Sequence, residues 1–169
     1  MTTGGTGITF GPSNPIDVDF YFYGKYLEAL HAGLIDVNTY PIYVMLTNNL
    51  YVPNQDTHQF KSDVTNEING SGYFEGGQPI TGVEALYQVV GSTKQLVVTG
   101  GNLVWPAVTW TGTNAPSFAV AYLNSPVDET QQPLIGYLDF GGTQSPVDQA
   151  FYIDWPIGGI YTLTIPNAP

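Results

Sequence analysis

The sequence predicts an all-β protein: an antiparallel β-sandwich of the jelly-roll or immunoglobulin-like type, with one N-terminal helix and an extended N-terminal arm. Three observations support this prediction. Short segments rich in aromatic and β-branched residues recur from residue 40 onward, clusters of Gly, Pro, Asn and Ser separate them, and only one segment has a clear helical periodicity. Because 169 residues suit one domain, we expect residues 19–169 to form a single β-sandwich domain.

The extended arm is predicted over residues 1–18, which are rich in Gly, Thr, Ser and Pro and show little periodicity. Ordering such a segment costs about 1–2 kcal/mol per residue, a cost that is offset only if a partner supplies surface. We therefore expect the arm to be mobile in an isolated monomer and ordered against an adjacent subunit in an assembly. Four apolar side chains of the arm are candidates for that interface: Ile8, Phe10, Ile16 and Val18.

The helix is predicted at about residues 19–32, within the segment "DFYFYGKYLEALHAG". Asp19 is a plausible N-cap and Gly33 a plausible C-terminal stop. Gly24 weakens the prediction by about 1 kcal/mol relative to alanine. Apolar residues recur there at intervals of three to four positions, as on one helical face: Phe20, Tyr23, Leu27, Leu30 and Leu34.

The strands are predicted in the apolar segments that follow. Each is short and bounded by turn-forming residues, which is typical of antiparallel sheets in sandwiches and barrels. The segments are "YPIYVMLT", "PITGVEALYQVV", "KQLVVTG", "LVWPAVTW", "SFAVAYLN", "PLIGYLDF", "QAFYIDW" and "GIYTLTI".

The charge balance excludes several partners. Fourteen acidic residues face only Lys25, Lys61 and Lys94, without any arginine, so the formal net charge is −11. Such a chain repels nucleic-acid phosphates and anionic membranes, and we expect neither as a partner. The absence of cysteine excludes a disulfide, a thiolate nucleophile and a cysteine metal site. No motif predicts a cofactor.

One motif suggests chemistry, the "NQDTHQF" segment at residues 54–60, which places Asp56, Thr57 and His58 side by side. A catalytic interpretation makes His58 a base oriented by Asp56. Neighbours on an extended chain point in alternating directions, however, and Asp and Thr side chains commonly bind backbone amides in turns. We therefore predict that these three residues belong to a structural loop and are not catalytic.

Two other groups of acidic residues are candidate sites. Asp139 and Asp154 interrupt apolar strands and could form a glycosidase carboxylate pair, although outward-facing positions explain them more simply. The segments "DVD" at 17–19 and "DVN" at 36–38 offer oxygen ligands for calcium but lack a complete calcium loop. We predict no catalytic or metal-binding residues, and leave open a calcium ion at a subunit interface.

Aromatic residues, which make up 14% of the chain, suggest a binding function. Clusters such as "FYFYGKY" and "VWPAVTW" could stack sugar rings, as in a carbohydrate-binding module. Tyrosine-rich surfaces also suit protein contacts, because the ring buries area while its hydroxyl keeps a polar partner. Protein binding is the favoured interpretation, with the carbohydrate-binding module as an alternative.

Several segments resemble a group of tailed-bacteriophage virion structural proteins. The resemblance covers residues 22–165 and is most specific in "NQDTHQFKSDVTNEINGSGY" and "PLIGYLDFGG". It implies a non-enzymatic, β-rich virion protein, and we favour a capsid decoration or cement protein on the capsid surface. Such a protein would bind the major capsid protein or other virion subunits and form a homo-oligomer, with a trimer favoured. A tail or baseplate structural protein is the alternative within this class.

Overall fold

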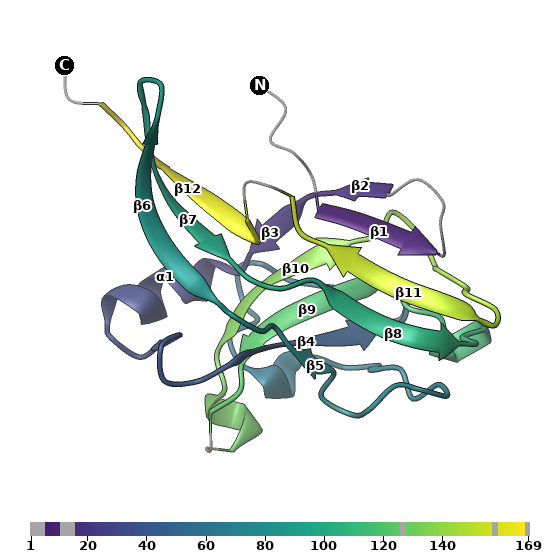
Figure 1. The fold of residues 1–169 in the computed structure, drawn as a ribbon. Helices are drawn as coiled ribbons and strands as arrows, with labels where there is room; N and C mark the ends of the chain where they lie inside the picture. The colour runs from purple at the N-terminus through teal and green to yellow at the C-terminus, as the bar shows by residue number, and fades with distance from the viewer. Residues whose placement is uncertain (1–5, 11–15, 126–127, 157–158, 168–169) are drawn as a thin grey trace.

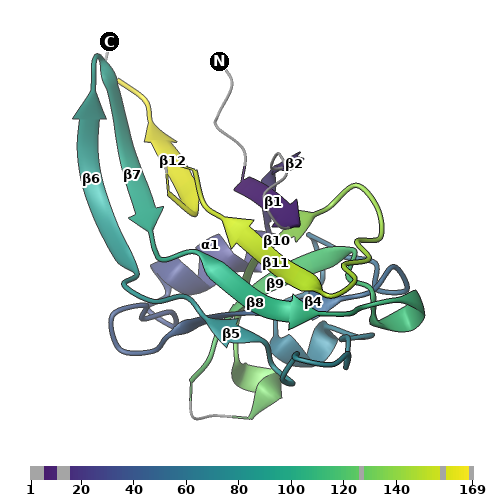
Figure 2. The same cartoon turned by 45° about the vertical axis from the view of Figure 1, so that its right-hand side comes forward.

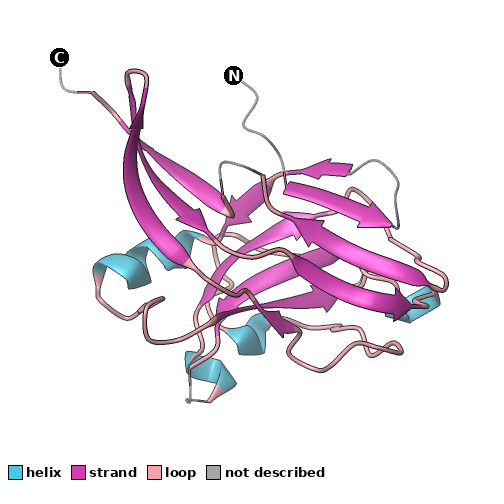
Figure 3. Ribbon diagram, viewed as in Figure 1, coloured by secondary structure: helices cyan, strands magenta, loops and turns pink. Residues whose placement is uncertain are grey.

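The computed structural model of the 169-residue chain describes residues 6–10, 16–125, 128–156 and 159–167. These residues form a mostly β structure with three antiparallel sheets (Figures 1 and 3). Among them, one segment forms an α-helix, α1 (Gly24–His31). Three short 3-10 helices lie in the loops: Lys61–Asp63, Gly112–Asn114 and Glu129–Gln131. The β-rich class and the presence of an N-terminal helix agree with the sequence.

Each sheet is antiparallel, and two of them stack to enclose the core (Figure 1). The five-stranded sheet has the order β3 (Phe20–Phe22), β10 (Leu134–Asp139), β9 (Phe118–Leu123), β4 (Ile42–Thr47), β5 (Gln78–Pro79). The four-stranded sheet has the order β2 (Ile16–Val18), β1 (Thr6–Phe10), β11 (Gln149–Asp154), β8 (Leu103–Val108). The three-stranded sheet has the order β12 (Tyr161–Ile165), β7 (Thr93–Thr99), β6 (Glu84–Val90).

The main core lies between the four-stranded and five-stranded sheets. In β11 the buried Phe151 and Ile153 alternate with the partly exposed Tyr152 and Asp154, as expected of a sheet with one face in the core. The five-stranded sheet is buried on both faces in β4 and β9. A second apolar cluster covers its outer face and consists of Tyr23, Met45, Tyr51, Val120, Tyr122 and Leu134.

The helix is shorter than the sequence predicts. Residues 20–22 form strand β3, which pairs with β10 and places Phe22 opposite Gly136. A Cβ atom at Gly136 would lie 2.3 Å from the Phe20 ring, so this glycine makes room for the aromatic strand. Sheet pairing and aromatic packing therefore outweigh the helical periodicity of this segment. The predicted stop is correct, because Gly33, with a φ of 70°, follows the helix and the Leu34 amide donates to the Ala29 carbonyl.

The described parts of the predicted arm join the four-stranded sheet of their own chain. Strand β1 pairs with β11, which places Ile8 opposite Ile153 and Phe10 opposite Phe151, while Ile16 in β2 faces Ile8. Val18 is buried in the core of the same chain. Residues 1–5 and 11–15 lie outside the described residues. A contact of Ile8, Phe10, Ile16 or Val18 with a neighbouring subunit stays a prediction.

Candidate docking surface

The three-stranded sheet of β12, β7 and β6 projects from the body of the molecule (Figure 2). We call it the projecting sheet. It is linked to the core by chain connectivity, because β7 is followed by β8 and β11 by β12. Since β8 pairs with β11 and β7 pairs with β12, the same two segments pair in the core sheet and again in the projecting sheet.

Polar contacts fix the junction between these two sheets. The Asn102 side-chain amide donates to Asp154 at 2.8 Å, and its oxygen accepts from the Trp155 backbone amide at 3.0 Å. The Trp155 indole donates to the Gly101 carbonyl at 3.0 Å. Gly159, with a φ of 86°, lies so close to β7 that a Cβ atom would be 2.4 Å from the Val98 carbonyl oxygen. The angle of the projecting sheet is therefore set by specific bonds at its base.

The base of the projecting sheet is also buried against α1 and β3. Val98 and Tyr161 belong to the main core, and the Tyr161 hydroxyl shares a short hydrogen bond with the hydroxyl of Tyr26 on α1. The ring of Tyr161 packs on Phe20 and Phe22. Burial raises the pKa of the Tyr161 hydroxyl, which therefore stays protonated at neutral pH. This aromatic group anchors the base, so the projecting sheet is part of the folded unit.

The strand register divides the side chains of the projecting sheet between two faces, one of which is more apolar than the other. Residues directly opposite each other in antiparallel strands share a face. One face, which we call the apolar face, carries Ala85, Tyr87, Val89, Lys94, Leu96, Val98, Tyr161, Leu163 and Ile165. The other face carries Glu84, Leu86, Gln88, Val90, Thr93, Gln95, Val97, Thr99, Thr162 and Thr164. Lys94 is the single charged residue on this face. Such a composition is typical of a surface that is covered by another part of a protein or by a partner.

Toward the hairpin tip this apolar face is open to solvent. The exposed fraction is 59% for Tyr87, 54% for Val89 and 42% for Ile165, whereas Val98 at the base is 2% exposed. Leu86 and Val90 on the other face are also exposed. Contiguous exposed apolar surface of this kind commonly marks a protein-binding site. The distal half of the projecting sheet is therefore the candidate docking surface.

Charge distinguishes the projecting sheet from the rest of the molecule. Its described strands carry two charged residues, Glu84 and Lys94, which cancel, whereas the whole chain has a net charge of −11. Lys25 pairs with Glu28 and Lys61 with Glu129, but Lys94 forms no ion pair with any described residue. A partner, including an acidic one, can therefore approach this surface with little local repulsion.

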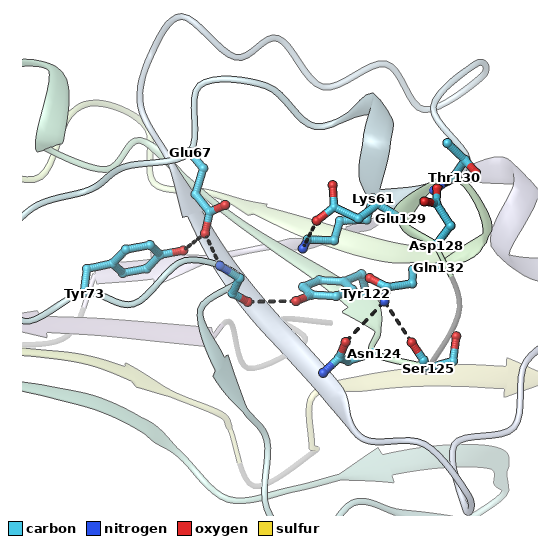
Figure 4. Close-up of polar contacts among 11 residues, drawn as sticks. Lys61, Glu67, Tyr73, Tyr122, Asn124, Ser125, Asp128, Glu129, Thr130 and Gln132 are labelled. Atoms are coloured by element: carbon cyan, nitrogen blue, oxygen red, sulfur yellow. Dashed lines mark hydrogen bonds and ion pairs between the residues drawn. The ribbon is translucent and has the colours of Figure 1, made fainter.

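The long polar segment between β4 and β5 is held by a hydrogen-bond network (Figure 4). One oxygen of Glu67 accepts from the Tyr73 hydroxyl at 2.5 Å and from the Gly76 amide at 2.6 Å. The Gly76 carbonyl accepts from the Tyr122 hydroxyl at 3.0 Å, and the Lys61 ammonium lies 5.3 Å from the centre of the Tyr122 ring. The network ties the loop to β9, and it offers a structural explanation for these polar residues.

Glu67 gives this network a pH dependence. Burial raises the pKa of its carboxyl above the usual 4.5, against the opposing effects of its hydrogen bonds and Lys61. The stabilising contribution of protonated Glu67 is therefore complete below pH 4.5 and is lost as the pH rises through the raised folded-state pKa. Since both bonds go to one oxygen, Glu67→Gln can keep them without a buried charge.

We expect Glu67→Gln to gain stability relative to the wild type as the pH rises from 4 to 7. Urea unfolding at pH values across this range would measure the difference. Glu84→Gln, which removes a carboxylate from an exposed position on β6, away from this network, is the matched control. A constant difference between Glu67→Gln and the wild type at all pH values would contradict the assignment.

In the 54–60 loop, Asn54 has the capping role. Its side-chain oxygen accepts from the backbone amides of Asp56 and Thr57 at 3.0 and 3.1 Å. His58 Nδ1 lies 2.9 Å from the Tyr51 hydroxyl, which in turn bonds Tyr23. The Asp56 carboxylate is exposed and makes no hydrogen bond with another described residue. The catalytic arrangement of His58 with Asp56 is therefore not formed.

Asn54→Ala is expected to lower the free energy of unfolding by about 1 kcal/mol, because two amides lose their acceptor. Asp56→Ala is expected to change it by less than about 0.5 kcal/mol, as for an ordinary surface substitution. Chemical denaturation of both variants would test the assignment. The reverse order of the two effects would assign the capping role to Asp56 instead.

The remaining sequence candidates lie apart or have local partners. Asp139, in β10, accepts from the Gly141 amide, whereas Asp154 belongs to β11 in the other core sheet. Asp36 accepts from the Thr39 hydroxyl and from two backbone amides, and these bonds lower the pKa of its carboxyl. The described residues contain no group of three or more acidic or histidine side chains that could hold a metal ion. No helix among them is long and apolar enough to cross a membrane.

Comparisons with known proteins add no relative. No protein-family model, curated protein or solved structure matches this chain. The docking surface was also missed by sequence reasoning, although its strands were predicted. Its signal was present in "VEALYQVVGSTKQLVV", where apolar residues occupy both faces of one hairpin, including Leu86, Tyr87, Val89 and Val90. Because β6 is exposed along its whole length, packing within the chain does not explain that composition.

Proposed function

We propose that this chain is a non-enzymatic structural protein of a phage virion, located on the capsid surface. In this proposal it is a decoration protein that binds the major capsid protein and stabilises the head. The two stacked core sheets are proposed to form a β-sandwich of the jelly-roll or immunoglobulin-like type. The resemblance of the polar segment and of "PLIGYLDFGG" to virion proteins supports the class of protein.

The exposed apolar face of the projecting sheet is the observation that carries this proposal. A rigidly anchored sheet with exposed Tyr87, Val89 and Ile165 provides a protein-binding element but no reacting groups. Such a contact need not be strong, because repetition over a symmetric shell multiplies a modest affinity. A tail or baseplate position uses the same surface and remains the alternative.

The carbohydrate-binding alternative loses its main support. The aromatic clusters that suggested it supply the core: Tyr23, Tyr26, Trp105 and Trp110 are each at most 1% exposed. A sugar-stacking platform requires exposed ring faces. These four buried rings are therefore not available to stack a sugar, which supports the choice of protein binding over a carbohydrate-binding module, although Tyr21 of the first cluster is 40% exposed.

Phage heads assembled without this protein would test the proposal. The purified chain is expected to co-sediment with such heads and raise the temperature at which they open. A variant with residues 89–94 replaced by Asn-Gly shortens the hairpin at the Gln88–Gln95 pair and should bind at least about tenfold more weakly. Val52→Ser, at an exposed apolar position outside the projecting sheet, is the control. Binding to tails but not heads would select the alternative, and binding to neither would refute the proposal.

A further inference from the structure

Strand β6 presents one unpaired edge. It pairs with β7 on one side, and no described residue pairs with its other side, which we call the open edge. The strand is seven residues long and contains no Pro, Gly or Lys; its one charged residue is Glu84 at its start. Natural proteins normally protect such an edge, because it is a template for another strand.

The other edge strands of this molecule are shorter or protected. β2 and β3 have three residues each, and β5 has two, including Pro79. β8 contains Pro106 and then Ala107 with a φ of 52°, and the Gln78 side chain donates to its Val104 carbonyl. β12 has five residues and is followed by Pro166. The lack of protection on β6 is therefore specific to that strand.

Hairpin geometry identifies the groups that β6 offers. The turn of Gly91 and Ser92 has Gly91 at a φ of 63°, as a type II′ turn requires. The pair that closes such a two-residue turn, Val90 and Thr93, is hydrogen-bonded, and bonded pairs alternate along an antiparallel ladder. The amides and carbonyls that point to the open edge are therefore those of Ala85, Tyr87 and Val89.

We propose that the open edge of β6 binds β6 of a second copy of this chain, antiparallel, around a two-fold axis at Tyr87. In this register Tyr87 faces Tyr87 of the second copy, and Ala85 faces Val89 of the second copy. The backbone amides and carbonyls that point to the open edge of each strand can then form hydrogen bonds with those of the other strand. This inference does not depend on where the protein sits in a particle.

Side chains support the same register. The three residues that offer edge hydrogen bonds also lie on the apolar face, so pairing joins two apolar faces across one six-stranded sheet. Two tyrosines meet at the axis, a favourable cross-strand pair. Glu84 faces Val90 of the second copy, so no like charges are opposed although each chain has a net charge of −11. The edge is therefore complementary to itself.

The size of this contact determines how strongly two copies associate, and its symmetry determines how many copies assemble. Stable interfaces bury about 1,200–2,000 Å² in total, and one pair of short strands buries less, so association in solution should be weak and concentration-dependent. Two antiparallel edges close as a dimer. This contact therefore differs from the trimer that the sequence favoured.

Cysteine cross-linking tests the register, because the chain contains no cysteine of its own. In a bonded antiparallel pair the Cα atoms lie about 5.5 Å apart, which suits a disulfide. Tyr87→Cys should form disulfide-linked dimers at least about tenfold faster than Thr164→Cys, an exposed position on the opposite outer strand. Equal rates for the two variants would overturn the proposal.

A charge exchange at the axis tests self-recognition. Sedimentation of the wild type should show a mass that rises from monomer toward dimer with concentration. Tyr87→Lys and Tyr87→Glu should each stay monomeric, because like charges then meet at the axis, whereas their equimolar mixture should associate. The same exchange at Gln88, which faces Leu86 of the second copy, should give no such rescue.

Three outcomes would each overturn the proposal: a wild type that stays monomeric, a trimer insensitive to position 87, or a mixture that fails to associate. Thermal unfolding of dilute samples would show whether each charged variant is folded. If one of them is unfolded, the Tyr87→Cys cross-linking experiment decides the proposal.

Discussion

Gly77→Ala is expected to destabilise the protein by more than about 4 kcal/mol, a large fraction of the stability of a typical domain. Gly77 has a φ of 79°, and a Cβ atom there would lie 1.8 Å from the carbonyl oxygen of Val44. The obstacle is backbone of the buried strand β4, which cannot move aside without breaking the five-stranded sheet. Far-ultraviolet circular dichroism and thermal unfolding of the purified variant would measure the effect.

Gly82→Ala is the matched control for this prediction. Gly82 also has a positive φ, 60°, but no atom lies within 4 Å of a Cβ built there. Its cost is therefore conformational, about 1–2 kcal/mol. If both variants lost the same stability, the close approach of Gly77 to β4 would not be the reason for its glycine.

Trp110→Ala is expected to lower the free energy of unfolding by about 3–5 kcal/mol, the usual cost of removing a large buried aromatic side chain. The Trp110 side chain is fully buried and its ring contacts Tyr73, Trp105 and Phe151. Its removal leaves a cavity between the two core sheets, bordered by Gly70, which packs directly on the indole. Urea unfolding would measure this loss.

Replacement by phenylalanine separates packing from hydrogen bonding. The Trp110 indole donates to the Ser71 carbonyl at 3.0 Å, whereas the buried Trp105 indole nitrogen has no hydrogen-bond partner among the described residues. Trp110→Phe should therefore cost more than Trp105→Phe by about 1 kcal/mol, the net value of one hydrogen bond. Equal costs would show that the Ser71 bond contributes little.

Local patterns predicted the main strands well. Residues such as Phe151 and Ile153 alternate with more polar neighbours because only one face of their strand is buried. The same reasoning placed the helix start too early. Phe20 and Phe22 are spaced as on one face of a strand, whereas Phe20 and Tyr23 are spaced as on a helical face. The strand is favoured by packing against Gly136, more than a hundred residues away. Such long-range packing leaves no local signal in the chain.

The candidate site was less predictable than the fold. Strands β6 and β7 were visible in the sequence, but their projection from the body depends on the junction of Asn102, Trp155 and Gly159, which only the folded chain brings together. In the 54–60 loop, the motif directed attention to Asp56 and His58, whereas the cap is Asn54. Asp56 and His58 are close in the sequence and suggested a catalytic pair, but in the folded chain His58 contacts Tyr51 and the Asp56 side chain is exposed.

The link between the core sheet and the projecting sheet also determines how the molecule would carry a mechanical load. Strand β7 is followed directly by β8, so a pull on the hairpin tip passes along covalent backbone into the four-stranded sheet. The hydrogen bonds of an antiparallel ladder lie across its strands. Tension along β7 and β8 therefore loads many of these bonds together in shear, which resists force far better than opening them one at a time. A load on the projecting sheet would therefore be resisted by the β8–β11 ladder of the four-stranded sheet.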